Sequence, residues 1–279
     1  MFNRGGSGRS SAWKMRLVIA AVIAGISLIS YLATSDKNPI TGESQRVGLS
    51  KDEEIALGLQ AVPEMTAQHQ GLHPDRDAQD NVDQVGQKLL MGLDRELSQQ
   101  GRSNPYPFEF HLLRDGQTVN AFALPGGQVF ITAALYEQFE TEGQLAGVLG
   151  HEIGHVLSRH GAQQLAKQQL TSGLAGAAGV AGGGVESAQM AQAIGTMVNL
   201  KYGRAAELES DRWGVRLMAA AGYDPRAMVG VMKILEKASG AGGQPEFLSS
   251  HPKPANRVAY IEEVIDEEFP KGIPPGLKP

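Results

Sequence analysis

The hydrophobic positions of the chain form one unbroken apolar run near the N-terminus, followed by segments with regular spacing. The run covers residues 17–33. Apolar residues three to four positions apart predict helices at about 51–62, 75–99, 142–169, 186–199, 204–221, 225–239 and 254–268. Alternation predicts a strand at 107–113, and a second strand is predicted at 128–132, between a turn at 125–127 and a short helix. Many helices with a small antiparallel or mixed sheet predict an α+β fold.

The apolar run is long enough to anchor the chain in a membrane. As a helix it would span about 25 Å, slightly less than the ~30 Å hydrocarbon core, and Thr34 and Ser35 can extend it. The run exceeds the usual ~7–15 residues of a signal-peptide core, and no clean A-x-A site follows it. We therefore expect residues 1–35 to hold a basic leader and an uncleaved signal anchor. A cleaved export signal and a buried helix are the alternatives.

The charges before the apolar run predict its orientation. Residues 1–16 contain no acidic residue and four basic ones: Arg4, Arg9, Lys14 and Arg16. Because positive charge marks the cytoplasmic side of a span, we expect the body of the protein on the exported side, in a bacterial periplasm or cell envelope. A basic leader without acids also fits a mitochondrial presequence, which would place the body at the mitochondrial inner membrane.

The composition after the run is that of a globular protein. The 279 residues are 42% hydrophobic and carry a net charge of -5, and no stretch of the body has the basic character that nucleic-acid binding requires. The chain has no cysteine, so a metal must be held by His, Asp or Glu. We predict a linker at 36–50, one domain over 51–270 and an extended Pro-rich tail at 271–279. The glycine-rich segment 173–184 predicts a flexible loop, with a gating lid or a membrane-contacting surface as alternatives.

The stretch HEIGHVLSRH, residues 151–160, carries the clearest chemistry. His151 and His155 are four residues apart, so a helix presents them one turn apart on one face, where both can reach one Zn²⁺. Glu152 is rotated about 100° from His151 and can reach a water on the metal. His160 does not fit the ligand spacing, and we expect it at the surface or supporting a ligand.

A catalytic zinc needs three protein ligands, so one must come from elsewhere in the chain. The metzincin spacing would require histidine at position 161, which is Gly161. Glu207 and Asp211 instead head an apolar helix face, where acids are costly unless paired or metal-bound. We predict Glu207 as the third ligand and Asp211 as the acceptor for a ligand histidine. A carboxylate pair stabilised only by the helix dipole is the alternative. Glu209, on the opposite side, is predicted to be solvated.

Several spaced motifs resemble one family. The motifs are NPITGESQ, NAFALPGGQVFIT, LAGVLGHEIGHVLSRH, ELESDRWG, AGYDP and SSHPKPANR, spread over residues 38–268. Together they resemble the HtpX/BepA-like zinc metallopeptidases, gluzincins that include the CAAX prenyl endopeptidase and the mitochondrial overlapping-activity peptidase. With one hydrophobic run and no tetratricopeptide repeats, the chain is most similar to exported BepA-like members. It departs from the family pattern at Ser210, where Ala is usual, and at Gly203, where Ser is common.

The resemblance implies a zincin-type metallopeptidase domain with one zinc ion per chain. Its pattern E-x-x-A-D places the third ligand on Glu207 and a ligand-supporting acid on Asp211. It also implies that Glu152 acts as the base in peptide hydrolysis. His251 of SSHPKP is implied to lie near the zinc as an oxyanion donor or a fourth ligand, with an ordinary loop histidine as the alternative.

The strand beside the zinc helix is predicted to be the edge strand that pairs with extended substrate. Its residues are Gln128, Val129, Phe130, Ile131 and Thr132. Asn120 is expected to shape the same rim. We therefore predict a zinc endopeptidase that cleaves extended or misfolded membrane-associated or envelope polypeptides in protein quality control. A metal-bound chaperone-like protein with little turnover and a hydrolase of non-peptide substrates are the alternatives, and the oligomeric state stays open.

Overall fold

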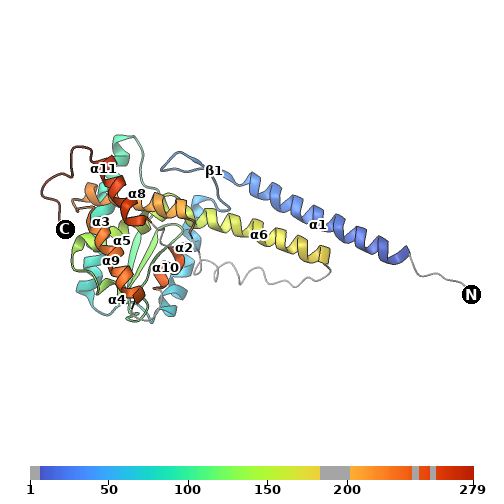
Figure 1. The fold of residues 1–279 in the computed structure, drawn as a ribbon, viewed down its shortest axis with the longest axis horizontal. Coiled ribbons are helices and arrows are strands. Elements are labelled where there is room, and N and C mark those ends of the chain that lie inside the picture. The colour runs from blue at the N-terminus through green and yellow to red at the C-terminus, as the bar shows by residue number, and fades with distance from the viewer. Residues whose placement is uncertain (1–6, 183–201, 241–244, 252–255) are drawn as a thin grey trace, which may run out of the picture.

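In the computed structural model, which describes residues 7–182, 202–240, 245–251 and 256–279, a mostly helical body surrounds a small sheet and carries a long arm (Figure 1). The arm consists of two helices that lie side by side, α1 (Ser7–Ala33) and α6 (His160–Gly182). Helices predominate over strands, which confirms the predicted α+β class. The helix predicted at 186–199 lies outside the described residues.

The glycine-rich segment is part of α6. The predicted flexible loop is therefore wrong for residues 173–182, while residues 183 and 184 lie outside the described part of the chain. A Cβ at Gly173 would lie 2.2 Å from Oγ of Ser27 on α1, so glycine lets the two helices pack closely. Packing against a neighbouring helix outweighs the low helix propensity of glycine here.

The segment predicted as a linker, residues 36–50, holds a small hairpin that binds the end of α5 (Glu142–Leu157). Its antiparallel strands are β1 (Ser35–Lys37) and β2 (Ser44–Arg46). Asn38 Nδ2 donates to the carbonyl of Leu157 at 2.8 Å, and Gln45 Nε2 donates to the carbonyl of Ser158 at 3.1 Å. Carbonyls at a helix C-terminus have no intrahelical partner. The hairpin therefore caps the helix that carries the histidine motif.

The central sheet has its strands in the order β3-β5-β4. They are β3 (Glu109–Leu113), β4 (Ala121–Leu124) and β5 (Gln128–Thr132). β3 is parallel to β5, whereas β4 is antiparallel to it. The turn between β4 and β5 contains Gly126 and Gly127 with φ of 85° and 109°, values that favour glycine. The sequence predicted this turn but not β4, which is a four-residue strand too short to show a period.

The remaining described helices surround the sheet. They are α2 (Lys51–Gln68), α3 (Arg76–Gln99), α4 (Ala133–Tyr136), α5 (Glu142–Leu157), α8 (Arg204–Ala221), α9 (Ala227–Gly240), α10 (Glu246–Ser250) and α11 (Arg257–Glu268). Side chains set several starting points: Ser50 forms a capping box with Glu53, Asp75 caps α3, and Thr141 caps α5. The tail is held as well, since the carbonyl of Pro279 accepts a hydrogen bond from the first turn of α5.

The single helix predicted over 142–169 is in fact two helices. Between α5 and α6, Arg159 has φ of 55°, a left-handed conformation that interrupts the helix. Its buried guanidinium is fixed by ion pairs to Glu54 at 2.6 Å and to Asp36 at 2.7 Å. A strained backbone persists where the surroundings hold it from several sides. The local sequence gives no sign of this break.

Candidate metal centre

The histidine motif lies on α5 where α8 packs closely against it. A Cβ at Gly150 would lie 3.2 Å from a Cα of α8, and one at Gly154 would lie 2.8 Å from a Cβ of α8. The glycines directly before His151 and His155 therefore allow the backbone of α8 to approach. This close approach brings the first turn of α8, with Glu207, to the two histidines.

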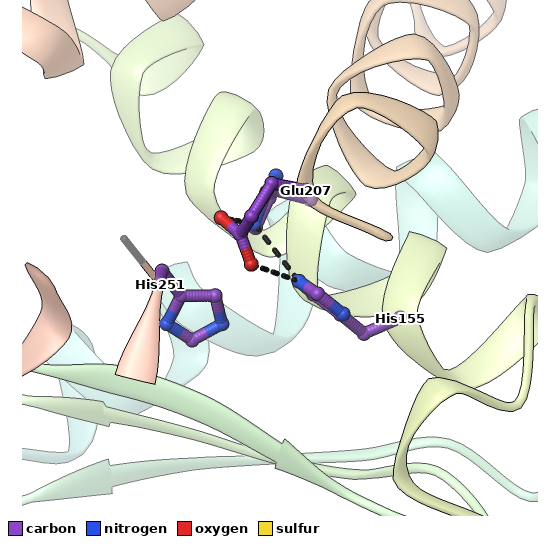
Figure 2. Close-up of side chains that lie close together, drawn as sticks. His155, Glu207 and His251 are labelled. Atoms are coloured by element: carbon purple, nitrogen blue, oxygen red, sulfur yellow. Dashed lines mark hydrogen bonds and ion pairs between the residues drawn. The ribbon is translucent and has the colours of Figure 1, made fainter. Parts of the chain in front are cut away.

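The three residues predicted as ligands converge. Nε2 of His151 and Nε2 of His155 lie 3.1 Å apart, and a carboxylate oxygen of Glu207 lies 3.6 Å from the first of these nitrogens. The other oxygen of Glu207 lies 3.5 Å from Nε2 of His155 (Figure 2). Two atoms bound ~2.0–2.1 Å from one ion at a tetrahedral angle are about 3.3–3.4 Å apart. The spacing of the three side chains therefore fits a single ion of the size of zinc.

The charge of the cluster also fits a cation. Glu207 is fully buried, and neither of its oxygens accepts a hydrogen bond from a described residue. Burial raises the pKa of Glu207 to about 9, in spite of the guanidinium of Arg257, whose Nη1 lies 3.3 Å away. A divalent cation at the converging atoms would stabilise the carboxylate form of this acid.

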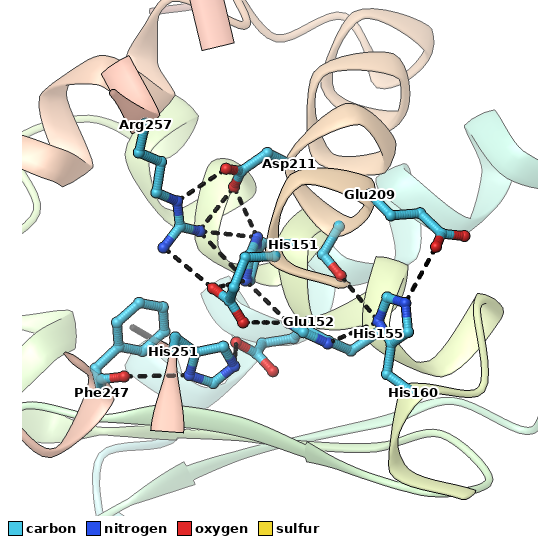
Figure 3. A network of polar contacts seen from close by, with 11 residues as sticks. His151, Glu152, His155, His160, Glu209, Asp211, Phe247, His251 and Arg257 are labelled. Carbon is cyan, nitrogen blue, oxygen red and sulfur yellow. Dashed lines mark hydrogen bonds and ion pairs between the residues drawn. The ribbon is translucent and has the colours of Figure 1, made fainter. Parts of the chain in front are cut away.

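Asp211 supports His151 from one turn further along α8. Its Oδ1 lies 2.9 Å from Nδ1 of His151, which leaves Nε2 of the ring directed at the cluster (Figure 3). Burial favours the neutral acid, but Arg257 and His151 outweigh it and lower the pKa of Asp211. A carboxylate that accepts from a ligand histidine fixes the tautomer and orientation of the ring.

Arg257, at the start of α11, was missed by the sequence analysis. It is almost completely buried and donates to both carboxylate oxygens of Asp211, from Nε at 2.8 Å and from Nη2 at 2.7 Å (Figure 3). Its Nη2 also lies 3.1 Å from Nδ1 of His151. The residue ends the motif SSHPKPANR, which was the available signal, but its partners on α5 and α8 depend on the tertiary fold.

Glu152 faces the same cluster. Its side chain is fully buried, and its Oε1 lies 3.5 Å from Nε2 of His251. Burial raises the pKa of Glu152 to about 8, although Arg257 and the backbone of Ala123 on β4 act to lower it. A carboxyl group with this pKa can both accept and donate a proton near neutral pH.

His251 lies directly after α10 and completes the cluster. Its ring stacks on Phe247 with centroids 4.4 Å apart, and its Nδ1 lies 3.3 Å from the carbonyl of that residue. One ligand atom each from His251, His151, His155 and Glu207 lie within 4.8 Å of one another. The structure thus brings all of the predicted ligands and Glu152 to one place, with His251 on the side of the sheet (Figures 2 and 3).

Of the two locations expected for His160, the surface is wrong, and the structure agrees with a position behind a proposed ligand. The residue is buried, its Nδ1 lies 2.9 Å from Nδ1 of His155, and its Nε2 lies 3.2 Å from Oε2 of Glu209. The break at Arg159 turns the ring back towards α5, which a continuous helix would not allow. Glu209 keeps a side chain that is 38% exposed, in line with the expected solvation, and it also accepts a hydrogen bond from Ser158 at 2.5 Å.

Tyr202 is a second residue that the sequence analysis missed. Its ring stacks on the ring of His155 with centroids 4.0 Å apart. With Ala123, Leu124 and Pro125 it lines a small, partly open pocket beside His155. An aromatic side chain upstream of a helix has no distinguishing sequence signal.

The predicted edge strand is wrong. Strand β5, residues 128–132, lies in the centre of the sheet, and its hydrogen-bonding groups pair with β3 on one side and β4 on the other. Strand β4 has β5 on one side and no further strand among the described residues on the other. Asn120, expected at the rim, is buried at the start of β4, and its backbone N–H donates to Thr132.

Comparison with known proteins agrees with this geometry. The model of peptidase family M48 matches residues 77–265, a range that includes every member of the cluster. The chain is 31% identical over 252 residues to the beta-barrel assembly-enhancing protease of Escherichia coli and 31% identical over 254 residues to that of Yersinia pestis; each match covers 87% of this chain. It is 28% identical to the mitochondrial metalloendopeptidase OMA1 of Saccharomyces cerevisiae over 94% of this chain and 80% of that protein.

The matches confirm the resemblance that the motifs predicted. The chain spans about half the length of the two beta-barrel assembly-enhancing proteases, since the matches cover 50% of each. The family match, in contrast, extends over most of this chain and includes both helices that supply the converging side chains. On this evidence the chain belongs to peptidase family M48.

Proposed function

We propose that this chain is a zinc-dependent endopeptidase. The observation that supports the proposal best is the position of Glu152, a buried acid with a raised pKa, beside the converging atoms of His151, His155 and Glu207. Two histidines and one glutamate are a ligand set typical of catalytic zinc sites. When bound there, zinc supplies Lewis acidity that polarises the scissile carbonyl and lowers the pKa of water.

The residues of the chain have separate roles in this proposal. Glu152 accepts a proton from the attacking water and later donates it to the leaving amine. Asp211 holds His151 in the tautomer that directs Nε2 at the metal, and Arg257 holds Asp211. Tyr202 fixes the orientation of the His155 ring by stacking on it.

His251 has two roles open to it. As a donor, its ring would stabilise the oxyanion that forms during hydrolysis. As a fourth ligand, it would close the position that substrate needs, and the enzyme would be latent until the loop moved. Its place in the four-member cluster supports the second role, and its contact with Glu152 is compatible with both.

Substrate is proposed to bind as an extended strand along β4. The strand lies beside α5, and a backbone hydrogen bond from Ala123 on β4 reaches the carboxyl group of Glu152. A peptide paired with β4 would therefore pass in front of this acid. Main-chain pairing gives little side-chain selectivity. We therefore expect unfolded or misfolded segments as substrates. The relatives are named as a protease and a metalloendopeptidase, which supports polypeptide substrates. We further propose that these substrates are envelope or membrane proteins.

We also propose that α1 anchors the enzyme in a membrane with the body on the exported side. Within the described residues, one helix, Ala12–Ala33, is long and apolar enough to cross a bilayer. Arg4 and Arg9 lie before it, and Lys14 and Arg16 lie near its N-terminal end; together they favour a cytoplasmic N-terminus. A bacterial cell envelope and a mitochondrial inner membrane both remain compatible with this orientation.

Glu152→Gln in the full chain tests the proposal. We expect the variant to bind zinc as the wild type does, measured by metal analysis, and to lose cleavage of unfolded casein by roughly 10²-fold or more. Glu142→Gln, also on α5 but distant from the cluster, should keep both properties. His251→Ala should be assayed alongside, because a latent enzyme would gain activity in this background. Undiminished cleavage by Glu152→Gln would overturn the mechanism. Zinc binding without cleavage in the wild type and in His251→Ala would favour a binding protein.

A further inference from the structure

The two helices of the arm are fitted to each other. α1 runs towards the body and α6 runs away from it, so the pair is antiparallel (Figure 1). The helices approach closely at Gly173, where an added Cβ would meet the side chain of Ser27. Ala20 of α1 and Ala177 of α6 are both buried. Small residues at a helix pair are typical of helices that pack within membranes.

The polarity of α6 changes at the point where it leaves the body. Gln169 lies next to the loop after β2, near the body. A Cβ added at Gly48 in that loop would lie 3.0 Å from the side-chain oxygen of Gln169. From Leu170 to the end of α6, no residue is charged, and Lys167 is the last charged residue of the helix. Residues 170–182 are about 20 Å long as a helix and run along the apolar part of α1. The uncharged half of α6 therefore lies at the same depth as the candidate span.

Two hydroxyl groups in this region donate hydrogen bonds within their own helices. Thr171 Oγ1 donates to the carbonyl of Lys167 at 2.9 Å, and Ser27 Oγ donates to the carbonyl of Ile23 at 2.9 Å. Such bonds remove the cost of placing a hydroxyl where no water is available. Both side chains are therefore compatible with a hydrocarbon environment.

The ends of the apolar part of α1 carry residues typical of membrane interfaces. On the side away from the body lie the exposed Trp13, Lys14 and Arg16. On the side of the body, the guanidinium of Arg46 lies 5.6 Å from the centre of the Tyr31 ring and donates to the backbone at the end of α1. Aromatic and basic residues of this kind concentrate at the two surfaces of a bilayer.

The apolar surface of α1 is too broad for one protein partner. Its exposed large residues are Leu17, Val18, Ile19, Val22, Ile26, Leu28, Ile29 and Leu32. At 100° per residue they cover about 200° of the circumference, the whole side that α6 leaves open. A second copy of the chain would cover one face, whereas lipid surrounds the helix. The distribution therefore favours acyl chains over a protein as the occupant of this surface.

We propose that α1 and residues 170–182 of α6 form one two-helix unit that enters the bilayer together. The outer surface of this unit contacts lipid acyl chains, and α1 is retained in the mature protein because it has a fitted partner. Since α6 begins at His160, which contacts His155, the unit holds the metal centre near the membrane surface. The proposal concerns the surface of the arm and does not depend on enzymatic activity.

Cysteine labelling tests the contact with lipid, because the chain has no cysteine of its own. Leu174→Cys places one label on α6, and Leu59→Cys places one on α2 in the body; the native side chains are 43% and 47% exposed. Each full-length variant is labelled in detergent with an environment-sensitive fluorophore and reconstituted into phosphatidylcholine–phosphatidylglycerol vesicles. With lipids brominated on the acyl chains, we expect roughly threefold or stronger quenching at position 174 than at 59. Equal quenching at the two positions overturns the proposal.

A second experiment tests whether α1 is retained. In Ser27→Cys/Gly173→Cys the two Cβ atoms would start 2.8 Å apart, so a small separation of the helices reaches the ~3.5–4.5 Å of a disulfide. We expect an intramolecular disulfide in membranes and an intact N-terminus by mass spectrometry, while Ser27→Cys/Leu59→Cys forms none. A mature chain that begins after residue 33 overturns the proposal. So does efficient crosslinking of Leu174→Cys between two chains, which would identify a second copy as the occupant.

Discussion

Oε1 of Glu207 lies 3.5 Å from Nε2 of His155, although the two residues belong to different helices (Figure 2). The contact exists because glycines on α5 have no side chain and so allow the backbone of α8 to approach closely. One geometric condition, the close packing of two helices, thus assembles the proposed ligand set, which neither helix contains alone. The predictions on metal binding and on helix packing both follow from it.

Glu207→Ala is expected to abolish stable zinc binding. The substitution removes the only proposed carboxylate ligand and leaves two histidines on one helix, which bind zinc far more weakly than three ligands do. Because loss of even a residue behind a ligand lowers affinity roughly 10–100-fold, loss of Glu207 itself should exceed that range. Competition with a chromogenic chelator measures the affinity. Glu142→Gln, at the start of α5 and distant from the cluster, is the control and should stay within a few-fold of the wild type. Retention of wild-type affinity by Glu207→Ala would remove it from the ligand set.

Arg257→Met is expected to destabilise the fold. The buried guanidinium makes two hydrogen bonds to Asp211 and lies 3.3 Å from Glu207, so methionine leaves two buried acids without their cation. Loss of one partner from a buried ion pair typically costs about 3–5 kcal/mol. Urea unfolding of the metal-free protein at pH 7 measures the change. Arg257→Lys keeps the charge but not the paired hydrogen bonds, and should lose less. A loss below about 1 kcal/mol for Arg257→Met would show that Asp211 does not depend on this residue.

The parts of the site that lie close together in sequence could be predicted. The spacing of His151 and His155 fixes their relation on any helix, and the apolar face of α8 made Glu207 a candidate before its partner was known. The start of the chain was informative for a similar reason, because an apolar run is a local property. Local periodicity is thus sufficient wherever a single helix determines the geometry.

Other parts depend on packing between distant segments and could not be predicted. The position of β5 in the centre of the sheet depends on β4, which is too short to show a recognisable hydrophobic pattern in the sequence. The break at Arg159 depends on Glu54 and Asp36, both remote in sequence. The helical state of the glycine-rich segment depends on α1. In each case tertiary contacts outweigh local propensity.

Gly154→Ala is expected to lower both stability and zinc affinity. The added Cβ would lie 2.8 Å from the Cβ of Trp213 and 3.0 Å from the Cα of Ser210, so α8 must move away. Overpacking of this kind costs about 1–3 kcal/mol, and a shift of α8 carries Glu207 away from His155. Thermal unfolding with and without zinc measures both effects. Gly176→Ala, on a helix where nothing lies within 4 Å of the added atom, should not lower stability. Equal behaviour of the two variants would mean that α8 is not held by this contact.

The buried pair of His69 and Asp115, remote from the metal centre, is expected to make the free energy of unfolding fall as the pH becomes acidic. Oδ2 of Asp115 lies 3.0 Å from Nδ1 of His69. Burial acts to raise the pKa of Asp115, but hydrogen bonds from Thr118, Gln117 and His69 outweigh it and lower this pKa to about 2, below the ordinary 3.8. Because the folded-state pKa is the lower one, the ionised carboxylate stabilises the fold above about pH 4. This contribution disappears as the pH falls through the folded-state value near 2.

Asp115→Asn removes the charge and keeps one oxygen acceptor for the backbone N–H groups of Gln117 and Thr118. Urea unfolding of both proteins without metal, at several values between pH 2 and 6, measures the difference in their free energies of unfolding. We expect the wild type to be more stable by about 1–2 kcal/mol at pH 6, with the difference shrinking towards zero between about pH 4 and 2. Removing the metal excludes loss of ligands as the cause of the acid dependence. A difference that stays constant across this range would mean that hydrogen bonding alone, and not the charge of Asp115, stabilises the loop.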